Sequence, residues 1–427
     1  MRDETVAIHG GYEGDAEKAG AVPIYQTVAH ELDSAETAGR IFDLEIPGFH
    51  YNRINNPTNA VLERRMAALE HGVAALTYSS GMAAVSHAVR NLATAGSNVV
   101  ALPQLYGATY NYFAHGLPEE GIEARFAPSD HPEAVASLID DRTRLVYCET
   151  VGNPAGNIVD LVALAEVAHD AGAPLVVDNT IATPLLLKPV DHGADVVVHS
   201  LTKFVGGHGT VLGGVVIDAG SFPWADHPAR FPMLNEPEPA FHGVVYARDF
   251  PEHPYLVRCR TIGMRNGGAT LAPFSAFLAI QGLETLAVRL ERQLANARTV
   301  AEHLRDDPRV AWVSYAGFPD HPSHALVERY LGGRCPSVLT FGVEGGYGAG
   351  IRLFDAVRLF KRMVNIGDSR SLVVHPASTT HRQLGPADLE AVGIRPDMIR
   401  LSLGLEHVDD LLEDLDQALS AATGRPG

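Results

Sequence analysis

The chain has few of the features that mark secreted, membrane-spanning or nucleic-acid-binding proteins. Only three of its 427 residues are cysteine, and no C-x-x-C pair occurs, so we expect neither a disulfide framework nor a thiolate zinc site. No apolar run approaches the ~18 residues that a membrane span needs. Lysine and arginine number 33 against 51 acidic residues, a net charge of −18. This balance argues against nucleic-acid or anionic-membrane partners, because both require a basic face.

The remaining composition is that of an ordinary globular protein. Apolar residues make up 46% and charged residues 20% of the chain, whose length suggests two or three domains. The first residues, MRDETVAIHGGYEGD, contain acids and no apolar core, so we expect no signal peptide. Widely spaced thiols suit a reducing compartment, and we therefore expect a cytoplasmic protein.

The pattern of the chain predicts an arm and two α/β domains. Residues 1–60 are rich in Gly, Pro, Asn and His and poorly periodic, which is typical of an extended arm. Beyond them, short apolar segments alternate with helical segments of 10–15 residues, which predicts a largely parallel sheet. We expect a large domain over 61–265 and a smaller C-terminal α/β domain over 266–427.

Individual elements can be predicted within these domains. We expect a long surface loop over 221–243, and helix ends at Gly72 and Gly172. The predicted helices cover 59–72, 80–96, 161–172, 271–306 (one or two helices) and 407–422. The predicted strands cover 74–80, 97–103, 143–150, 173–179, 194–200, 309–317, 337–343, 363–367 and 371–376.

An acid and a lysine follow two successive predicted strands. Asp178 ends one buried strand, and Lys203 comes just past the end of the next. In an open α/β sheet, ligands bind outside the carboxyl ends of the strands. We therefore expect both side chains to face one crevice.

This pair matches the needs of pyridoxal phosphate. A lysine forms a Schiff base with its aldehyde, and an aspartate keeps the pyridine nitrogen protonated, so that the ring can accept carbanion charge. A phosphate is held by backbone N–H groups where a turn opens a helix, and Gly81 and Met82 lie at such a turn. Ser200 and Thr202 can add hydroxyl donors, and Tyr106 can cover one ring face.

Taken together, these segments resemble the Cys/Met-metabolism (cystathionine-γ-synthase-like) family of pyridoxal-phosphate enzymes. The resemblance covers nearly the whole chain, and the long insertion before Gly243 together with residues 280–297 points to its sulfhydrylase branch. The motifs are YNRINNPT (51–58), YSSGMAA (78–84), YGATYN (106–111), ETVGNPAGN (149–157), DNTIATP (178–184), HSLTKFVGGHG (199–209), NIGDSRSLVVHPASTTHRQL (365–384) and IRLSLGLEHVDDLLEDLDQAL (399–419).

The resemblance implies a fold, a reaction and an assembly. The fold is type I, aspartate-aminotransferase-like, with a seven-stranded mainly parallel sheet and a smaller C-terminal α/β domain. The reaction is γ-replacement, in which O-acetyl-L-homoserine and sulfide or methanethiol give homocysteine or methionine and acetate. The assembly is a homotetramer built from dimers, with the arm over 1–60 contacting a neighbouring subunit.

The resemblance also implies residue roles. For the cofactor, Lys203 is the Schiff-base lysine, Asp178 the pyridinium partner, and Tyr106 the tyrosine that stacks on the ring and shuttles protons. Asn153 lies near the ring hydroxyl, and the phosphate site contains Gly81, Met82, Ser200 and Thr202. Two further phosphate ligands, Tyr51 and Arg53, come from the neighbouring subunit. For the substrate carboxylate they are Arg400, Asn153 and Asn365.

Several alternatives stay open. With the same cofactor, the chain could be a cystathionine γ-synthase, an O-succinylhomoserine sulfhydrylase or a γ- or β-lyase, although Ala108 stands where methionine γ-lyases carry a cysteine. A non-catalytic cofactor-binding protein is a further reading. Ser200 and Lys203 also match the S-x-x-K of serine acyl-transferring enzymes, but the chain lacks K-T-G. Without an H-E-x-x-H segment, we expect no metal site.

Overall fold

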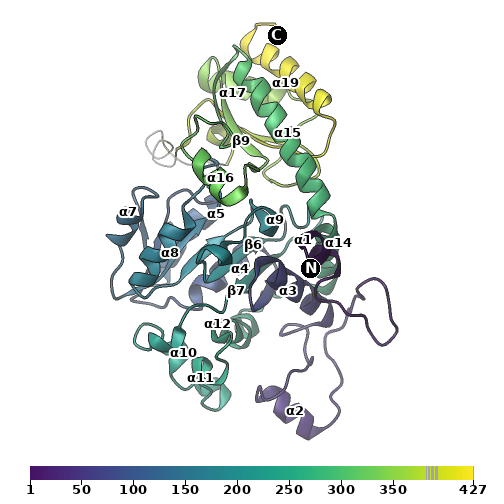
Figure 1. Ribbon diagram of the computed structural model, residues 1–427, viewed down its shortest axis with the longest axis vertical. Helices are drawn as coiled ribbons and strands as arrows, with labels where there is room; N and C mark the ends of the chain where they lie inside the picture. The colour runs from purple at the N-terminus through teal and green to yellow at the C-terminus, as the bar shows by residue number, and fades with distance from the viewer. Residues whose placement is uncertain (381, 383–384, 386–388, 390–392, 427) are drawn as a thin grey trace.

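Seven strands form the larger of two sheets. The computed structural model describes residues 1–380, 382, 385, 389 and 393–426 (Figure 1). The strand order is β1-β7-β6-β5-β4-β2-β3; β7 runs antiparallel to both neighbours, and the other neighbouring pairs are parallel, so the mainly parallel sheet is confirmed. The strands are β1 (Ala74–Tyr78), β2 (Asn98–Ala101), β3 (Glu123–Phe126), β4 (Thr143–Glu149), β5 (Leu175–Asp178), β6 (Val196–Ser200) and β7 (Gly214–Asp218). β3 and β7 were not among the predicted strands.

Helices cover both faces of this sheet, which explains its continuous apolar strands. In β6, Val197 packs into one core, and Val196 and Val198 pack into the other. The first core includes side chains of α3 (Pro57–Glu70) and α8 (Leu161–Asp170), and the second includes those of α4 (Gly81–Arg90). Strands buried on both faces read as apolar runs rather than as alternating patterns.

The smaller sheet has the order β10-β11-β12-β9-β8 and lies at the C-terminal end of the molecule (Figure 1). The predicted helical region over 271–306 forms two helices: α14 contacts α3 of the larger part, and α15 contacts β8. The boundary between 265 and 266 stays a prediction. The bounds are β8 (Val310–Ser314), β9 (Val338–Val343), β10 (Lys361–Arg362), β11 (Leu372–Val374), β12 (Met398–Ser402), α14 (Pro273–Glu284), α15 (Leu286–Asp306), α16 (His324–Leu331), α17 (Gly346–Ala356) and α19 (Val408–Thr423).

Short helices fill the connections. None of the described helices is both long and apolar enough to cross a membrane. The connecting helices are α5 (Gly107–Asn111), α6 (Leu117–Glu119), α7 (Pro132–Ala136), α9 (Thr183–Leu186), α10 (Pro232–Asn235), α11 (Tyr246–Asp249), α12 (Pro254–Arg258) and α13 (Arg265–Gly267).

The predicted arm is partly anchored. It contains two helices, α1 (Asp3–His9) and α2 (Ala35–Phe42). The buried Arg65 of α3 holds α1, because its guanidinium donates to the carbonyl oxygens of Gly10 at 2.7 Å and Ala7 at 3.1 Å. The part of the arm with α2 projects away from the sheets (Figure 1). The prediction of an irregular arm was therefore wrong for α1. The sequence of this segment has no periodic pattern that would have indicated its packing.

Three local predictions differ from the structure. The predicted strand over 363–367 is absent. Backbone groups that would bond to a neighbouring strand are used locally instead, as in the bond from Asn365 N–H to the Met363 carbonyl at 2.9 Å. The segment over 221–243 is not a surface loop, since Trp224 and Phe231 are buried in the second core. Helix α3 ends at Glu70, two residues before the predicted end at Gly72, and its C-cap His71 is left-handed at φ 61°. Gly72 is instead required because a Cβ there would lie 2.3 Å from Ile217.

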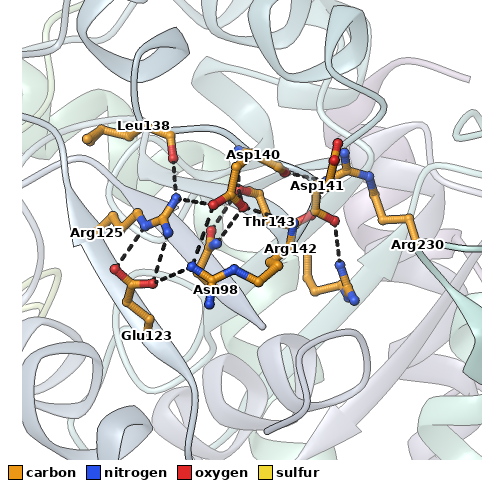
Figure 2. Close-up of polar contacts among 10 residues, drawn as sticks. Asn98, Glu123, Arg125, Leu138, Asp140, Asp141, Arg142, Thr143 and Arg230 are labelled. Atoms are coloured by element: carbon orange, nitrogen blue, oxygen red, sulfur yellow. Dashed lines mark hydrogen bonds and ion pairs between the residues drawn. The ribbon is translucent and has the colours of Figure 1, made fainter. Parts of the chain in front are cut away.

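A charged network ties together the amino ends of β2, β3 and β4 (Figure 2). Arg125 donates to Asp140 at 2.8 Å and to Glu123 at 2.9 and 3.0 Å, and Asn98 donates to Asp140 at 2.8 Å. Burial opposes the shift, but the bonds from Asn98 and Arg125 hold the pKa of Asp140 well below its usual range. The network fixes the end of the sheet opposite the carboxyl ends of these strands.

We expect the Asp140→Asn variant to unfold at a lower temperature than the wild type at neutral pH. A lowered folded-state pKa means that the carboxylate stabilises the fold above its unfolded-state pKa, and that this stabilisation is lost as the pH falls through the folded-state value. The difference between the two proteins should therefore shrink below about pH 4. Circular dichroism melts across pH test this; a difference that does not change with pH would contradict it.

Candidate active site

A cavity of about 670 Å³ lies at the carboxyl ends of β4, β5 and β6. Residues from β12 and from the stretch before β11 close it from the side of the smaller sheet. Ten of the residues predicted from the sequence line it: Gly81, Met82, Tyr106, Asn153, Asp178, Ser200, Thr202, Lys203, Asn365 and Arg400. The expected crevice outside the strand ends thus exists, and its lining residues come from both sheets.

The start of α4 forms one end of the cavity. Ser80 caps the helix, its Oγ accepting from the N–H of Ala83 at 3.1 Å. A Cβ on Gly81 would lie 2.6 Å from Cβ of Ser200, so only glycine lets the helix start approach that serine this closely. Thr202 lies nearby in the sequence, with its Oγ1 accepting from Gly213 N–H at 3.1 Å. Free backbone N–H groups at a helix start beside hydroxyls suit a phosphate.

Asp178 is held at the end of β5 as a buried carboxyl. The N–H of Thr180 donates to its Oδ1 at 2.9 Å. Burial raises the pKa of Asp178, although the bonds from Thr180 and the charge on His199 oppose the rise. A carboxylate in such surroundings is stabilised by a cation, as a protonated pyridine nitrogen would be. Thr180, which the sequence analysis did not single out, also accepts from Ser200 N–H at 2.8 Å and so joins β5 to β6.

Lys203 presents an amine that is easily deprotonated. Burial and the nearby Arg400 lower its pKa to about 8. Its Nζ donates to Oδ1 of Asn365 at 2.6 Å. Asn365, expected as a contact of the substrate carboxylate, therefore also orients the lysine. A neutral amine is the form that attacks an aldehyde or accepts a proton.

Arg400 brings a guanidinium from β12 into the cavity. It is only 9% exposed, and it donates to Oδ1 of Asn153 at 3.0 Å and to the Asn365 carbonyl at 3.3 Å. Burial lowers its pKa to about 10, against the influence of Tyr106. Within the described part of the chain no carboxylate pairs with it. The group is thus available for a carboxylate ligand, which a guanidinium binds with two parallel hydrogen bonds.

Tyr106 is the N-cap of α5, and its backbone is bound by Glu149, an acid that was not among the predicted site residues. Its ring is 40% exposed, and its backbone N–H donates to Oε1 of Glu149 at 2.5 Å. Glu149 ends β4 as Asp178 ends β5, and the two residues are register partners. The sequence signal that could have found Glu149 is the same one that found Asp178, an acid at the end of a buried strand.

Two predicted residues do not line the cavity of this chain. Arg53 donates to the carbonyl of Arg265, and its guanidinium lies over the ring of Tyr51, 5.3 Å from the centroid. Tyr51 is exposed. Their predicted role requires a neighbouring subunit and is not tested within one chain.

The residues present fit pyridoxal phosphate. A buried carboxyl that forms no ion pair among the described residues suits the ring nitrogen, an amine of lowered pKa suits the aldehyde, and the glycine-dependent helix start suits the phosphate. Each requirement is met by a different element, and all of them face one cavity.

We expect the cofactor-free protein to take up pyridoxal phosphate at a rate that rises with pH, with a midpoint near 8, because the pKa of Lys203 is lowered from 10.5 to about 8. The neutral amine dominates above that value. Stopped-flow absorbance measures the uptake, and Arg400→Ala should shift the midpoint upward. A midpoint near 10 in the wild type would contradict the lowered pKa.

Comparisons with known proteins extend over the whole chain. It matches the family of Cys/Met metabolism PLP-dependent enzymes over residues 4–420. It is 45% identical to the homocysteine synthase of Schizosaccharomyces pombe over 98% of both chains. It is 46% identical to O-acetyl-L-homoserine sulfhydrylase 1 of Thermus thermophilus, over 98% of this chain and 100% of that protein.

Solved structures agree and confirm the fold class. A Campylobacter jejuni protein assigned as an O-acetylhomoserine (thiol)-lyase, in which a lysine carries a pyridoxyl 5′-monophosphate, matches with a TM-score of 0.95 and 38% identity over 98% of this chain and 100% of that one. The metB protein of Corynebacterium glutamicum matches with a TM-score of 0.84 and 30% identity, over 98% of both chains. The chain belongs to the Cys/Met metabolism family of enzymes that depend on pyridoxal phosphate.

Proposed function

We propose that this enzyme transfers the aminocarboxypropyl group of O-acetyl-L-homoserine to sulfide or methanethiol, forming homocysteine or methionine and releasing acetate. The proposal is carried by a cavity that holds both the Lys203 amine and the Arg400 guanidinium, which no carboxylate of the described residues pairs with. The names of the relatives, homocysteine synthase and O-acetyl-L-homoserine sulfhydrylase, support it.

Each residue has a task on the substrate. Bound pyridoxal phosphate supplies the electron sink that makes the Cα and Cβ protons acidic. Arg400, held by Asn153, binds the α-carboxylate and sets the position of Cα. The freed Lys203 amine takes the Cα proton and then moves a proton at Cβ, so that acetate leaves from Cγ and the thiol adds there. Tyr106 covers the reacting face and excludes water.

The charges of the cavity favour the acetyl ester over the succinyl ester. Among its described lining residues, Lys203 and Arg400 are the cationic side chains, and both have tasks on the amino-acid part. The second carboxylate of a succinyl ester would therefore find no further cation among these residues, and its burial would carry a high desolvation cost. The apolar side chains that line the cavity include Val85, Val151, Ile181, Val364 and Ile366.

We expect Lys203→Ala to abolish turnover of O-acetylhomoserine with sulfide. Loss of a general base alone costs about 10²–10⁴-fold, and this lysine also holds the cofactor. Mass spectrometry of the product identifies homocysteine, and Lys361→Ala, which removes an exposed lysine, is the matched control. Sustained multiple turnovers by Lys203→Ala would refute the assignment.

We expect kcat/KM for O-acetylhomoserine to exceed that for O-succinylhomoserine by at least about tenfold, a difference of about 1.4 kcal/mol. Both esters are assayed with sulfide and with cysteine as acceptors. Equal or reversed preference for the esters would contradict the charge argument. Faster reaction with cysteine than with sulfide would favour a cystathionine γ-synthase.

We also propose that the active unit is a homodimer or a tetramer of dimers, in which Tyr51 and Arg53 reach the cofactor phosphate of the neighbouring subunit. Both belong to the arm over 1–60, and neither lines the cavity of its own chain. Exposed apolar side chains are frequent on the arm, as expected of a surface that a second copy covers. They are Ile24, Tyr25, Val28, Phe42, Phe49 and Tyr51.

Subunit mixing tests this shared site. Arg53→Ala and Lys203→Ala should each have little activity as separate proteins, since each removes one half of every site. Hybrids hold one intact site in each mixed dimer, so an equal mixture should recover about a quarter of the wild-type activity. Unchanged activity after refolding the mixture would show that Arg53 serves its own chain or no site.

The compartment is proposed to be the cytoplasm. Cys148, Cys259 and Cys335 are buried with free thiols, which are typical of a reducing environment. Burial raises the pKa of Cys148 and Cys259, the latter to about 12, so both resist oxidation.

A further inference from the structure

Glu149 places a second carboxyl group in the floor of the cavity. It is the last residue of β4, is 6% exposed and lines the cavity beside Asp178. Because the two residues are register partners on parallel strands, their side chains leave the sheet on the same face. The proposed reaction has given Glu149 no task.

The contact of Glu149 is with the backbone of the tyrosine that covers the cofactor. Its Oε1 accepts the N–H of Tyr106 at 2.5 Å. Tyr106 is the N-cap of α5, and its own side chain forms no capping bond. Helix starts leave N–H groups unpaired, so Glu149 satisfies one such donor and fixes where the chain of Tyr106 turns. The ring, in contrast, is open to the cavity.

The charge state of this acid follows from its surroundings. Burial and then the charge of Asp178 raise the pKa of Glu149 well above its usual range, against the bond from Tyr106. Tyr147 and Cys148 of the same strand are also buried and carry no positive charge. These surroundings favour the protonated form of Glu149 over its carboxylate.

We infer that Glu149 is a positioning residue, whose side-chain oxygen accepts the backbone N–H of Tyr106 and so holds this tyrosine over the cofactor. The inference rests on the proposed function for the task of Tyr106. A side-chain amide at this position would offer the same acceptor without a removable proton. A small apolar residue would leave the N–H of Tyr106 unpaired and allow α5 to shift.

The test compares Glu149→Gln with Glu149→Ala in the holoenzyme. We expect Glu149→Gln to keep kcat within about threefold of the wild type, whereas Glu149→Ala should lose at least about tenfold, because displacements of about 1 Å can cost up to 10²-fold. KM for O-acetylhomoserine should change less than kcat, since Arg400 is untouched. Equal damage in both variants would overturn the acceptor role, and full activity in Glu149→Ala would overturn any role.

A double-mutant cycle separates positioning from a general loss of structure. In a Tyr106→Ala background, Glu149→Ala should cause little further loss of kcat, because its effect passes through the tyrosine. Additive losses would overturn the inference. Melting temperature and cofactor content of each variant exclude misfolding; if Glu149→Ala does not fold, Glu149→Ser replaces it.

A substrate-free readout keeps this test apart from the proposed function. The visible absorption of the bound cofactor and its rate of release report on Tyr106 even if O-acetylhomoserine is not turned over. Both should change in Glu149→Ala and stay near the wild type in Glu149→Gln. Unchanged spectra and release in Glu149→Ala would overturn the positioning role whatever the substrate is.

Discussion

The structure depends on holding two acidic and two basic side chains together in one cavity. Asp178 and Glu149 end adjacent strands, and Lys203 and Arg400 face the same space. Removing such groups from water is unfavourable unless they are paired or hydrogen-bonded. Here the desolvation cost appears as shifted pKa values: raised for the acids, lowered for the cations. A cationic ring nitrogen would offset this cost at Asp178, an aldehyde at Lys203 and a substrate carboxylate at Arg400.

The fold keeps these groups in place by rigid packing around them. The strands that carry the acids are buried on both faces, and the charged network around Asp140 fixes the amino end of β4, which carries Glu149 (Figure 2). Lys203 follows a strand of the larger sheet, whereas Arg400 lies on β12 of the smaller sheet. One continuous core contains buried residues of both parts. Packing between the two sheets therefore sets the separation of the proton-transferring amine from the carboxylate-binding group.

The sequence predicted the parts of this arrangement that arise from local patterns. Apolar runs ending in Asp178 and just before Lys203 were sufficient to place both at strand ends, because buried parallel strands have a distinctive composition. Long-range pairing was harder to foresee: β3 (EARF) has no apolar run, and the anchoring of α1 by Arg65 is a contact between distant segments. The strand β7 was missed although Val215, Val216 and Ile217 form a buried apolar run. Residues 363–367 have the composition of a strand, but the chain turns there, and Asn365 accepts a hydrogen bond from Lys203. Glu149 also ends a buried strand, but only the strand register shows that it lies beside Asp178.

The most direct measurement is to find which side chain carries the cofactor. The purified enzyme would be treated with borohydride, digested and mapped by mass spectrometry. The account predicts a pyridoxyl phosphate label on the peptide containing His199 to Gly209, at Lys203. A label on another lysine, or no label on a protein that retains activity, would contradict it.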